Sequence, residues 1–342
     1  MVEKKVDEIS IIKTFLEVLG QPTIGYSRIG DDAAQLPYHG GKVVVKCDML
    51  VGETDVPQGM TYREAARKAF VSVVSDFAAK GVKPDAALIS LGIPPTLTLE
   101  DVRELALGVR DARDEFGFQF LGGDTNEAKD LIIDCVMIGY AEQIVERRGA
   151  RVGDAVVVTG DFGYTGAGLY ILSRYGRVSS GFAGRAVSAV LKPRPPLELG
   201  LALAEKRLMS SSIDSSDGLA ISLYTLAEAS SAKIVVYEMP AASGLIEFCG
   251  EHELNPEDLV FYSGEEYEIV FTTPKEKLDE VQRLARALGR GVRVIGEVQE
   301  GQATVEYVSQ SGKKVLERRG WIHLQQPARG KNKEVESATG AD

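Results

Sequence analysis

Residues 65–81 read AARKAFVSVVSDFAAKG, and this stretch decides much of the fold. It follows Thr61 and Glu64, whose spacing is that of a helix capping box, and it ends at Gly81, a typical C-terminal stop. The pattern predicts a buried helix, because apolar residues occur on nearly every side of it. Asp76 lies inside this apolar run. An unpaired Asp is almost never buried, so either a neighbouring Lys or backbone group balances it, or it belongs to a metal site, which we favour.

Five other short acidic segments occur along the chain, most of them where an apolar run stops beside Gly or Ser. They are Gly30-Asp31-Asp32, Cys47-Asp48, Gly122-Gly123-Asp124-Thr125, Asp214-Ser215-Ser216-Asp217-Gly218 and Gly264-Glu265-Glu266. Carboxylates at the ends of strands or helices can converge once the chain folds. Such a cluster favours hard cations such as Mg²⁺, which prefer oxygen ligands and usually arrive with a polyphosphate. The sequence therefore predicts metal-dependent phosphate chemistry.

These segments differ in specificity. KVVVKC (Lys42–Cys47) predicts a buried strand that stops at Asp48, and strand ends are where open α/β sheets collect ligands, although a plain turn Asp fits equally well. Asp124 follows two glycines, which permit close approach of the backbone to a ligand. Asp214 and Asp217 flank two hydroxyls, and this is the strongest local signal. A simple helix cap, the structural alternative, needs only one acid.

Three other features each have two interpretations. The glycine loop after the predicted strand Ala155–Thr159 suits a phosphate cradle, but it lacks the endings of known phosphate loops and fits a tight turn equally well. Arg148 could neutralise a phosphate or be a solvated linker charge. Trp321, the single Trp, either plugs a core edge or stacks on a flat ring, and the residues alone favour the plug.

The bulk properties exclude several classes of protein. With 342 residues the chain is long enough for two domains, and its net charge of −11 argues against wrapping nucleic acid. Its three Cys are far apart and its three His are scattered, so neither a disulfide framework nor a zinc site is expected. The N-terminus lacks a cleavable apolar leader, and no run reaches the roughly 18 apolar residues of a membrane span. We therefore expect a cytoplasmic protein without a membrane or nucleic-acid partner.

Each half of the chain mixes predicted strands and helices, which indicates two α/β or α+β domains. We place them at residues 1–146 and 147–324, followed by a polar, disordered tail at 325–342. The first half is predicted to hold helices at Glu8–Leu19, Thr61–Lys80 and Leu99–Phe116 and strands at Lys42–Cys47, Ala86–Gly92, Phe118–Leu121 and Leu131–Tyr140. In the second half the predicted strands are Ala155–Thr159, Ile234–Tyr237, Ile269–Thr272 and Val292–Val298, and the main helices are Leu197–Leu208, Asp217–Ala229 and Lys275–Leu288.

Taken together, these segments resemble the thiamine-monophosphate kinase family, within the superfamily shared by aminoimidazole ribonucleotide synthetase, selenophosphate synthetase and the hydrogenase maturation protein HypE. The resemblance covers nearly all of Met1 to His323 in family order. It is carried by IGDDAAQL (29–36), CDMLVGETD (47–55), KAFVSVVSDFAAKG (68–81), GGDT (122–125), RRGARVGD (147–154), LKPRPPLELG (191–200), IDSSDGL (213–219), YSGEEYEIVF (262–271) and GWIH (320–323).

The resemblance implies the two-domain aminoimidazole ribonucleotide synthetase-like fold, in which an N-terminal sheet forms a barrel in a homodimer and ATP binds in a cleft spanning both domains. It implies phosphorylation of thiamine monophosphate by ATP to give thiamine diphosphate. Several Mg²⁺ ions would be held by Asp32, Asp48, Asp76, Asp124, Asp214 and Asp217, with oxygens at Lys46 and Cys47. The implied ATP contacts are Gly123, Asp124, Arg148 and Ser216, and the implied contacts to thiamine monophosphate are Asp55, Glu265 and Trp321.

Two positions depart from the family pattern. Asp55 stands where relatives often carry a substrate-contacting His. Cys47 stands where a Thr or Ser often precedes the metal Asp, so any metal contact there is expected through the backbone carbonyl.

The chemistry of the predicted reaction needs no general base, because a phosphate oxygen is already a nucleophile near neutral pH. We expect charge neutralisation and in-line alignment, without a catalytic His or Cys and without a phosphoenzyme. An aminoimidazole ribonucleotide synthetase-like ligase is the enzyme alternative, and a non-catalytic nucleotide-binding relative is the alternative of another class. A selenophosphate synthetase would need a Cys or selenocysteine near its N-terminus, and no Cys precedes Cys47. HypE would end in a reactive Cys, whereas this chain ends in Thr-Gly-Ala-Asp.

Overall fold

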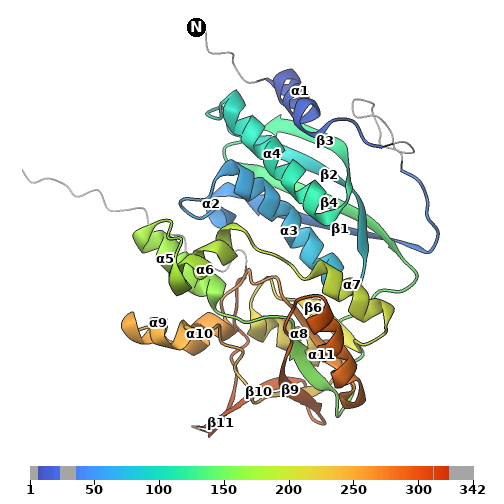
Figure 1. Cartoon of the computed structure of the whole chain (residues 1–342), viewed down its shortest axis with the longest axis vertical. Helices are drawn as coiled ribbons and strands as arrows, with labels where there is room; N and C mark the ends of the chain where they lie inside the picture. The colour runs from blue at the N-terminus through green and yellow to red at the C-terminus, as the bar shows by residue number, and fades with distance from the viewer. Residues whose placement is uncertain (1–6, 24–35, 311, 323–342) are drawn as a thin grey trace, which may run out of the picture.

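The computed structural model describes residues 7–23, 36–310 and 312–322. Two sheets lie at opposite ends of the long axis, and Figure 1 shows the N-terminal sheet in the upper half and the C-terminal sheet in the lower half. The predicted two-domain α/β organisation is therefore confirmed. The boundary that we place near residue 147 lies between the last strand of the first sheet and the first strand of the second.

The N-terminal sheet has four strands in the order β1-β4-β2-β3. Its strands are β1 (Lys42–Val51), β2 (Lys83–Ile93), β3 (Gln119–Glu127) and β4 (Ile132–Ala141). The helices α1 (Glu8–Leu19), α3 (Tyr62–Lys80) and α4 (Leu99–Phe116) lie together on one side of this sheet (Figure 1). They bury a shared apolar core that includes Phe70, Phe77 and Ile133. All three helices begin and end within one residue of their predicted positions.

The capping box that the sequence predicts for α3 is present. The Thr61 side chain accepts a hydrogen bond from the backbone of Glu64, and the Glu64 side chain accepts one from the backbone of Thr61. Gly81 ends the helix in the left-handed conformation, with a φ of 68°. Local sequence signals thus fix both ends of the longest helix in the described residues.

The opposite face of the N-terminal sheet is apolar and exposed. Side chains alternate along β1, so that every second one points away from the helices. Val43, Val45 and Met49 lie on this outer face and are 54%, 59% and 54% exposed. Large apolar side chains grouped on one exposed sheet face are uncommon on an isolated domain.

Two predicted turns of the first domain are instead parts of strands. β1 pairs with β4 through Val51, so Asp48 lies inside a half-exposed strand rather than after a buried one. Likewise, GGDT lies within β3, which pairs in parallel with β2 from Gln119 to Glu127 across a register shift. The prediction was wrong because both strands have an exposed face, where polar residues do not interrupt backbone pairing.

The C-terminal sheet has seven strands in the order β11-β10-β7-β9-β5-β8-β6. They are β5 (Ala155–Val158), β6 (Ser211–Asp214), β7 (Lys233–Val236), β8 (Ile269–Thr273), β9 (Arg293–Gln299), β10 (Thr304–Ser309) and β11 (Gly312–Val315). The helices are α5 (Tyr164–Tyr175), α6 (Gly181–Leu191), α7 (Leu197–Glu205), α8 (Leu219–Ser230), α9 (Leu245–Glu251), α10 (Pro256–Phe261) and α11 (Leu278–Ala287), with a 3₁₀ turn, η1 (Lys275–Lys277). In this half of the chain sequence reasoning missed α6, α9, α10, β6, β10 and β11.

Helix α3 joins the two domains. Its first half lies in the N-terminal core, whereas Ala78 and Ala79 near its end belong to a buried cluster with α7 and β8. The α7 backbone comes so close at Gly200 that an added Cβ would lie 2.1 Å from the carbonyl oxygen of Ala78. The Ser212 hydroxyl of β6 donates to the carbonyl of Ala79 over 2.7 Å. These contacts set one domain against the other along α3.

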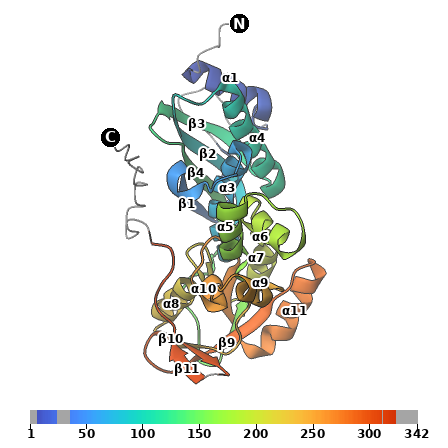
Figure 2. The same ribbon diagram turned by 90° about the vertical axis from the view of Figure 1, so that its left-hand side faces the viewer.

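Figure 2 shows the same two-part arrangement from the side, with α5, α6 and α7 between the two sheets. None of the helices in the described part of the chain combines the length and the apolar character that crossing a bilayer requires.

Candidate active site

A cleft of about 410 Å³ lies where α3 and β1 of the first domain face loops of the second. Residues from both halves of the chain line it: Lys46, Asp48, Met49, Leu50, Thr54, Asp55, Pro57, Lys68, Ser72, Asp76, Arg147, Leu169, Asp214, Ser216, Asp217, Gly264, Glu265, Tyr267 and Trp321. The cleft therefore gathers acids from four of the six segments that the sequence singled out.

Helix and strand periodicity explain which side chains reach the cleft. Lys68, Ser72 and Asp76 are spaced four residues apart, so they follow one face of α3. Lys46 and Asp48 are two residues apart on β1, so they share the face of the sheet that meets α3. Asp76 thus belongs to the largely apolar helix α3, and its side chain also lines the polar cleft.

The ammonium group of Lys46 lies between two carboxylates. Its Nζ is 2.8 Å from Oδ2 of Asp76 and 3.6 Å from Oδ2 of Asp48. Burial lowers the pKa of Lys46, but the charge of Asp76 and the hydrogen bond to it outweigh burial and raise that pKa overall. Burial raises the pKa of Asp48, with a smaller contribution from Asp76. The Lys46 ammonium thus balances the charge of Asp76, as in the interpretation that pairs Asp76 with a neighbouring Lys. The same ammonium lies between Asp76 and Asp48.

Asp214 reaches the same place from the second domain. It is the last residue of β6, it is only 5% exposed, and its Oδ2 accepts a hydrogen bond from the Ser75 hydroxyl of α3 over 2.7 Å. Burial, reinforced by the charge of Asp76, raises the pKa of Asp214 to about 7. Lys80, near the end of α3, donates a hydrogen bond to the carbonyl of Ser212 on β6. Burial together with the charge of Arg147 lowers the pKa of Lys80 to about 8.

The segment after β6 is not a helix cap. Helix α8 begins at Leu219 with Gly218 as its N-cap, and no side chain caps it. Ser216 and Asp217 line the cleft instead. The carbonyl of Asp217 accepts the backbone N–H of Trp321 over 2.9 Å, which holds the C-terminal segment over this loop. Trp321 lines the cleft and belongs to none of the three buried clusters, which argues against a core plug.

The loop before β8 is held by three consecutive side chains. Glu265 pairs with Lys68, Glu266 binds the start of α5, and the ring of Tyr267 is buried in the N-terminal core. Glu265 and Tyr267 have positive φ angles of 68° and 54°, a strained conformation for residues other than glycine. Strained backbone of this kind persists only where surrounding contacts over-determine it, and it is frequent at functional sites.

Glu266 also explains the glycine loop. One of its oxygens, Oε1, accepts the backbone N–H groups of Gly163 and Thr165, over 2.7 Å and 3.1 Å. The amides that would cradle a phosphate at the start of α5 therefore hold a carboxylate of the chain itself. This geometry supports the structural interpretation of the loop over the phosphate cradle.

Glu266 makes folding stability depend on pH. Burial raises its pKa to about 7, above the ordinary 4.5, although the backbone hydrogen bonds oppose this. Between these two pKa values the native state holds a proton that the unfolded state releases. The contribution of protonated Glu266 to the free energy of unfolding is therefore fully present below about pH 4.5 and is lost as the pH rises through 7. We expect Glu266→Gln to become more stable relative to wild type between pH 5 and pH 7.5, by at most about 1.4 kcal/mol per pH unit.

Urea unfolding of both proteins at pH 5, 6 and 7.5 measures this difference. Glu247→Gln, a change at an exposed residue of α9, serves as the control and should show no trend. A Glu266→Gln difference that stays constant with pH would contradict the assignment.

Not every predicted site residue lies in the cleft. Gly123 and Asp124 lie on β3, at the opposite edge of the sheet from β1. Asp124 is in register with Ser90, which in turn pairs with Asp134 on the outer face of the sheet. In one copy of the chain, therefore, Asp124 is separated from Asp48 by two intervening strands. Asp32 falls outside the described residues.

Two other predicted contacts involve Arg148 and Cys47. Arg148 is exposed and pairs with Glu146, while its neighbour Arg147 lines the cleft. The Cys47 thiol lies on the outer face of β1 and donates to Asp134 over 3.4 Å, so its side chain does not face the acids. This fits the expectation that any metal contact at Cys47 uses the backbone carbonyl.

Asp55 lines the cleft, but its carboxylate is already engaged. Asp55 ends the short helix α2 (Gly52–Asp55), and its Oδ2 accepts the backbone N–H of Val51 over 2.7 Å. Its carbonyl accepts a hydrogen bond from Lys68. Sequence reasoning missed Lys68, although a single Lys eight residues before Asp76 in an apolar helix was a usable signal.

The donor set of the cleft suits a hard cation. Asp48, Asp76, Asp214 and Asp217 offer only oxygen, which Mg²⁺ prefers. Within the described residues no three acidic, His or Cys side chains lie close enough together to hold a metal ion. The Lys46 ammonium between Asp48 and Asp76 shows that the two carboxylates accept a shared cation.

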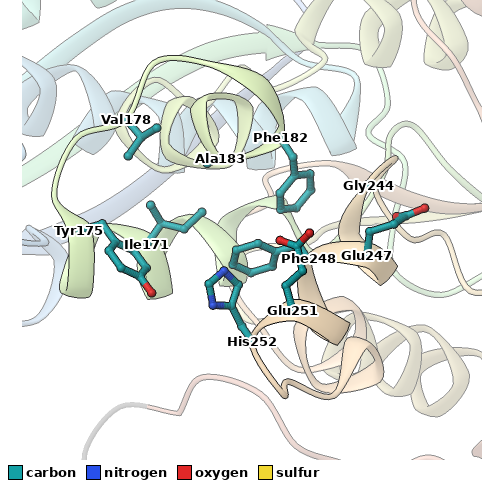
Figure 3. Close-up of a pocket in the computed structure, with 10 residues that line it drawn as sticks. All are labelled: Ile171, Tyr175, Val178, Phe182, Ala183, Gly244, Glu247, Phe248, Glu251 and His252. Atoms are coloured by element: carbon teal, nitrogen blue, oxygen red, sulfur yellow. The ribbon is translucent and has the colours of Figure 1, made fainter.

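A second hollow of about 360 Å³ lies between α5, α6 and α9. Figure 3 shows Tyr175, Phe182, Phe248 and His252 around it, with Glu247 and Glu251 beside them. The acidic segments that the sequence singled out do not contribute to it. Acids that the sequence singled out thus line the cleft at α3 rather than this hollow.

Comparison with known proteins identifies the family of this chain. Two family models, AIR synthase related protein, N-terminal domain, and AIR synthase related protein, C-terminal domain, match residues 30–141 and 151–309. The thiamine-monophosphate kinase of Nitrosopumilus maritimus is 38% identical over 321 residues, which are 94% of this chain and 99% of that protein. The chain belongs to the thiamine-monophosphate kinase family.

The fold of this chain is similar to that of solved structures. AaThiL complexed with AMPPCP and TMP is 28% identical, with a TM-score of 0.74 over 94% of this chain and 99% of that one. The hydrogenase maturation protein HypE, at 18% identity, has a TM-score of 0.75 over 95% of this chain and 99% of that one, which shows the fold alone. The fold is thus shared across the superfamily, and within it the sequence match selects the thiamine-monophosphate kinase family.

Proposed function

We propose that this protein transfers the γ-phosphoryl group of ATP directly to the phosphate of thiamine monophosphate, giving thiamine diphosphate and ADP. The observation that carries the proposal is the convergence of Asp48, Asp76 and Asp214 from three elements on one interdomain cleft. The membership in the thiamine-monophosphate kinase family and the relative solved with AMPPCP and TMP support the substrates.

The residues of the cleft explain how the reaction proceeds without a general base. The acceptor oxygen belongs to a phosphate and is a nucleophile near neutral pH, so the enzyme has to align two polyanions and offset their repulsion. Asp48, Asp76, Asp214 and Asp217 would hold Mg²⁺, which when bound neutralises phosphate charge. Lys46 and Arg147 add fixed positive charge in the same cleft. Glu265 and Trp321 are proposed to contact the thiamine part.

We also propose that the enzyme is a homodimer formed through the outer face of the N-terminal sheet. A second copy is the occupant that this face fits, because Val43, Val45 and Met49 are exposed on it and Asp124 projects on the same side. An isologous contact there would bring the Asp124 edge of each sheet toward the partner copy. Gly123 and Asp124 would then contribute to the site from that interface.

Val45→Glu is expected to make the protein monomeric, because it places a charge in the centre of the proposed contact. Light scattering after gel filtration measures the mass, which should be twice 36.9 kDa for wild type and 36.9 kDa for the variant. Val308→Glu, at an exposed position of β10, is the matched control and should leave the mass unchanged. A dimeric Val45→Glu protein would refute the interface.

The function itself is tested by ATP consumption in the presence of Mg²⁺, with and without thiamine monophosphate, while chromatography follows thiamine diphosphate. We expect ADP and thiamine diphosphate in equal amounts, and neither without the acceptor. Equal ADP formation without thiamine monophosphate would favour a ligase-like relative with another substrate, and ATP binding without turnover would favour a non-catalytic protein. A phosphorylated residue that turns over at the catalytic rate would exclude direct transfer.

A further inference from the structure

Lys68 is a buried cation that neither the acidic segments nor the family resemblance singled out. Its side chain is 3% exposed, although it lines the cleft from an apolar helix. A buried ammonium is costly unless its charge is balanced and its protons are bonded. Lys68 meets both needs: Nζ lies 2.5 Å from Oε1 of Glu265 and donates to the carbonyl of Asp55 over 2.8 Å.

The partner, Glu265, lies on a loop whose backbone is fixed independently. Its own N–H donates to the carbonyl of Ser216 over 2.7 Å, and the N–H of Tyr267 donates to the carbonyl of Ser215 over 2.9 Å. The buried ring of Tyr267 ties the loop to the N-terminal core. The backbone hydrogen bonds therefore fix the position of the Glu265 main chain, and the ion pair with Lys68 fixes the direction of its carboxylate.

The ion pair lies at a different part of the cleft from the acid cluster. Lys68 and Asp76 are eight residues apart on one face of α3, which corresponds to about 12 Å along the helix axis. One end of the cleft thus gathers Asp48, Asp76 and Asp214 for the phosphates. The other end has the carboxylate of Glu265, which the buried lysine orients, beside that of Asp55, which already accepts the backbone N–H of Val51.

We infer that Lys68 is a positioning residue for the phosphate acceptor: by holding Oε1 of Glu265 it orients the carboxylate toward the cationic thiamine part of thiamine monophosphate. The inference rests on the proposed function. The thiazolium ring of the acceptor carries a positive charge, which complements the carboxylate. Because Lys68 also bonds to the end of α2, the same contact sets the α2 segment against the Glu265 loop on the two sides of the cleft.

The test uses the full-length enzyme and compares Lys68→Met, Glu265→Gln and the double variant K68M/E265Q. We expect Lys68→Met to raise KM for thiamine monophosphate at least 10-fold, with KM for ATP within twofold of wild type. Glu265→Gln should raise the same KM similarly. The double variant should be no worse than Glu265→Gln alone, because the lysine acts through the carboxylate. Lys275→Met, which removes an exposed ion pair with Glu297, is the control and should leave both KM values unchanged.

The outcomes separate the possible roles of Lys68. A purely structural role would lower the melting temperature and leave KM for thiamine monophosphate within twofold, which would overturn the inference. Effects of the two single changes that multiply in the double variant would also overturn it. If Lys68→Met is too unstable to purify, the comparison of K68M/E265Q, in which both charges are removed, with Glu265→Gln decides the question. A wild-type enzyme that does not use thiamine monophosphate would instead refute the proposed function.

Discussion

Asp48→Asn is expected to lower kcat on the order of 10³-fold, equivalent to about 4 kcal/mol of transition-state stabilisation. Asp48 is one of the carboxylates that would hold Mg²⁺, and it faces Asp76 across Lys46. Replacing it with Asn keeps the shape and removes the charge. The folded protein should tolerate this, because burial already raises the pKa of Asp48 and thus disfavours its charged form.

Steady-state kinetics and thermal unfolding check this expectation together. The variant should melt within a few degrees of wild type, and the rise in melting temperature that Mg²⁺ gives the wild type should shrink. Asp114→Asn is the matched control, since Asp114 is exposed and pairs with its neighbour Arg113. An Asp48→Asn enzyme with near wild-type kcat would show that this carboxylate is not part of the reaction.

Trp321→Ala is expected to raise KM for thiamine monophosphate roughly 10-fold to 100-fold. Stacking of a flat ring on an aromatic side chain contributes about 1–3 kcal/mol, and Trp321 lines the cleft from a segment bonded to Asp217. KM for ATP should change much less. Trp321→Phe should recover part of the affinity, because a smaller ring still stacks.

Kinetics with each substrate varied in turn distinguish this role from a structural one. A Trp321→Ala enzyme with an unchanged KM for thiamine monophosphate and a lower melting temperature would show that Trp321 only supports the fold. Equal changes in both KM values would indicate a general disturbance of the cleft.

Most helices were predictable because their signals are local. The capping box at Thr61 and the glycine stop at Gly81 act within one or two turns of chain, and they set the ends of α3 as predicted. The strands were harder. Asp48 and Asp124 were assigned to turns because they are polar, whereas pairing with a neighbouring strand keeps both inside the sheet. Strand length depends on a partner that is distant in sequence, which single-residue preferences do not describe.

The site was predictable by residue type but not by arrangement. The apolar surroundings of Asp76 and the two acids of Asp214-Ser215-Ser216-Asp217 identified three of the cleft residues. Lys68 was missed because a lysine in a helix is ordinarily a surface residue; its place in an apolar run was a signal, and the buried pairing with Glu265 shows what it meant. Arg147 rather than its neighbour Arg148 lines the cleft, a difference of one residue that the charge pattern does not resolve.

The sequence by itself determined the family, the alternation of strands and helices in two halves, and the oxygen-rich chemistry, since composition and motif order carry these properties. Only the tertiary structure decided that Asp48, Asp76 and Asp214 line one cleft while Asp124 lies on the outer sheet face, and that the glycine loop binds Glu266. The physical reason is that side-chain proximity follows from how α3 packs against both sheets, and such long-range contacts are set by burial and backbone pairing between segments far apart in the chain.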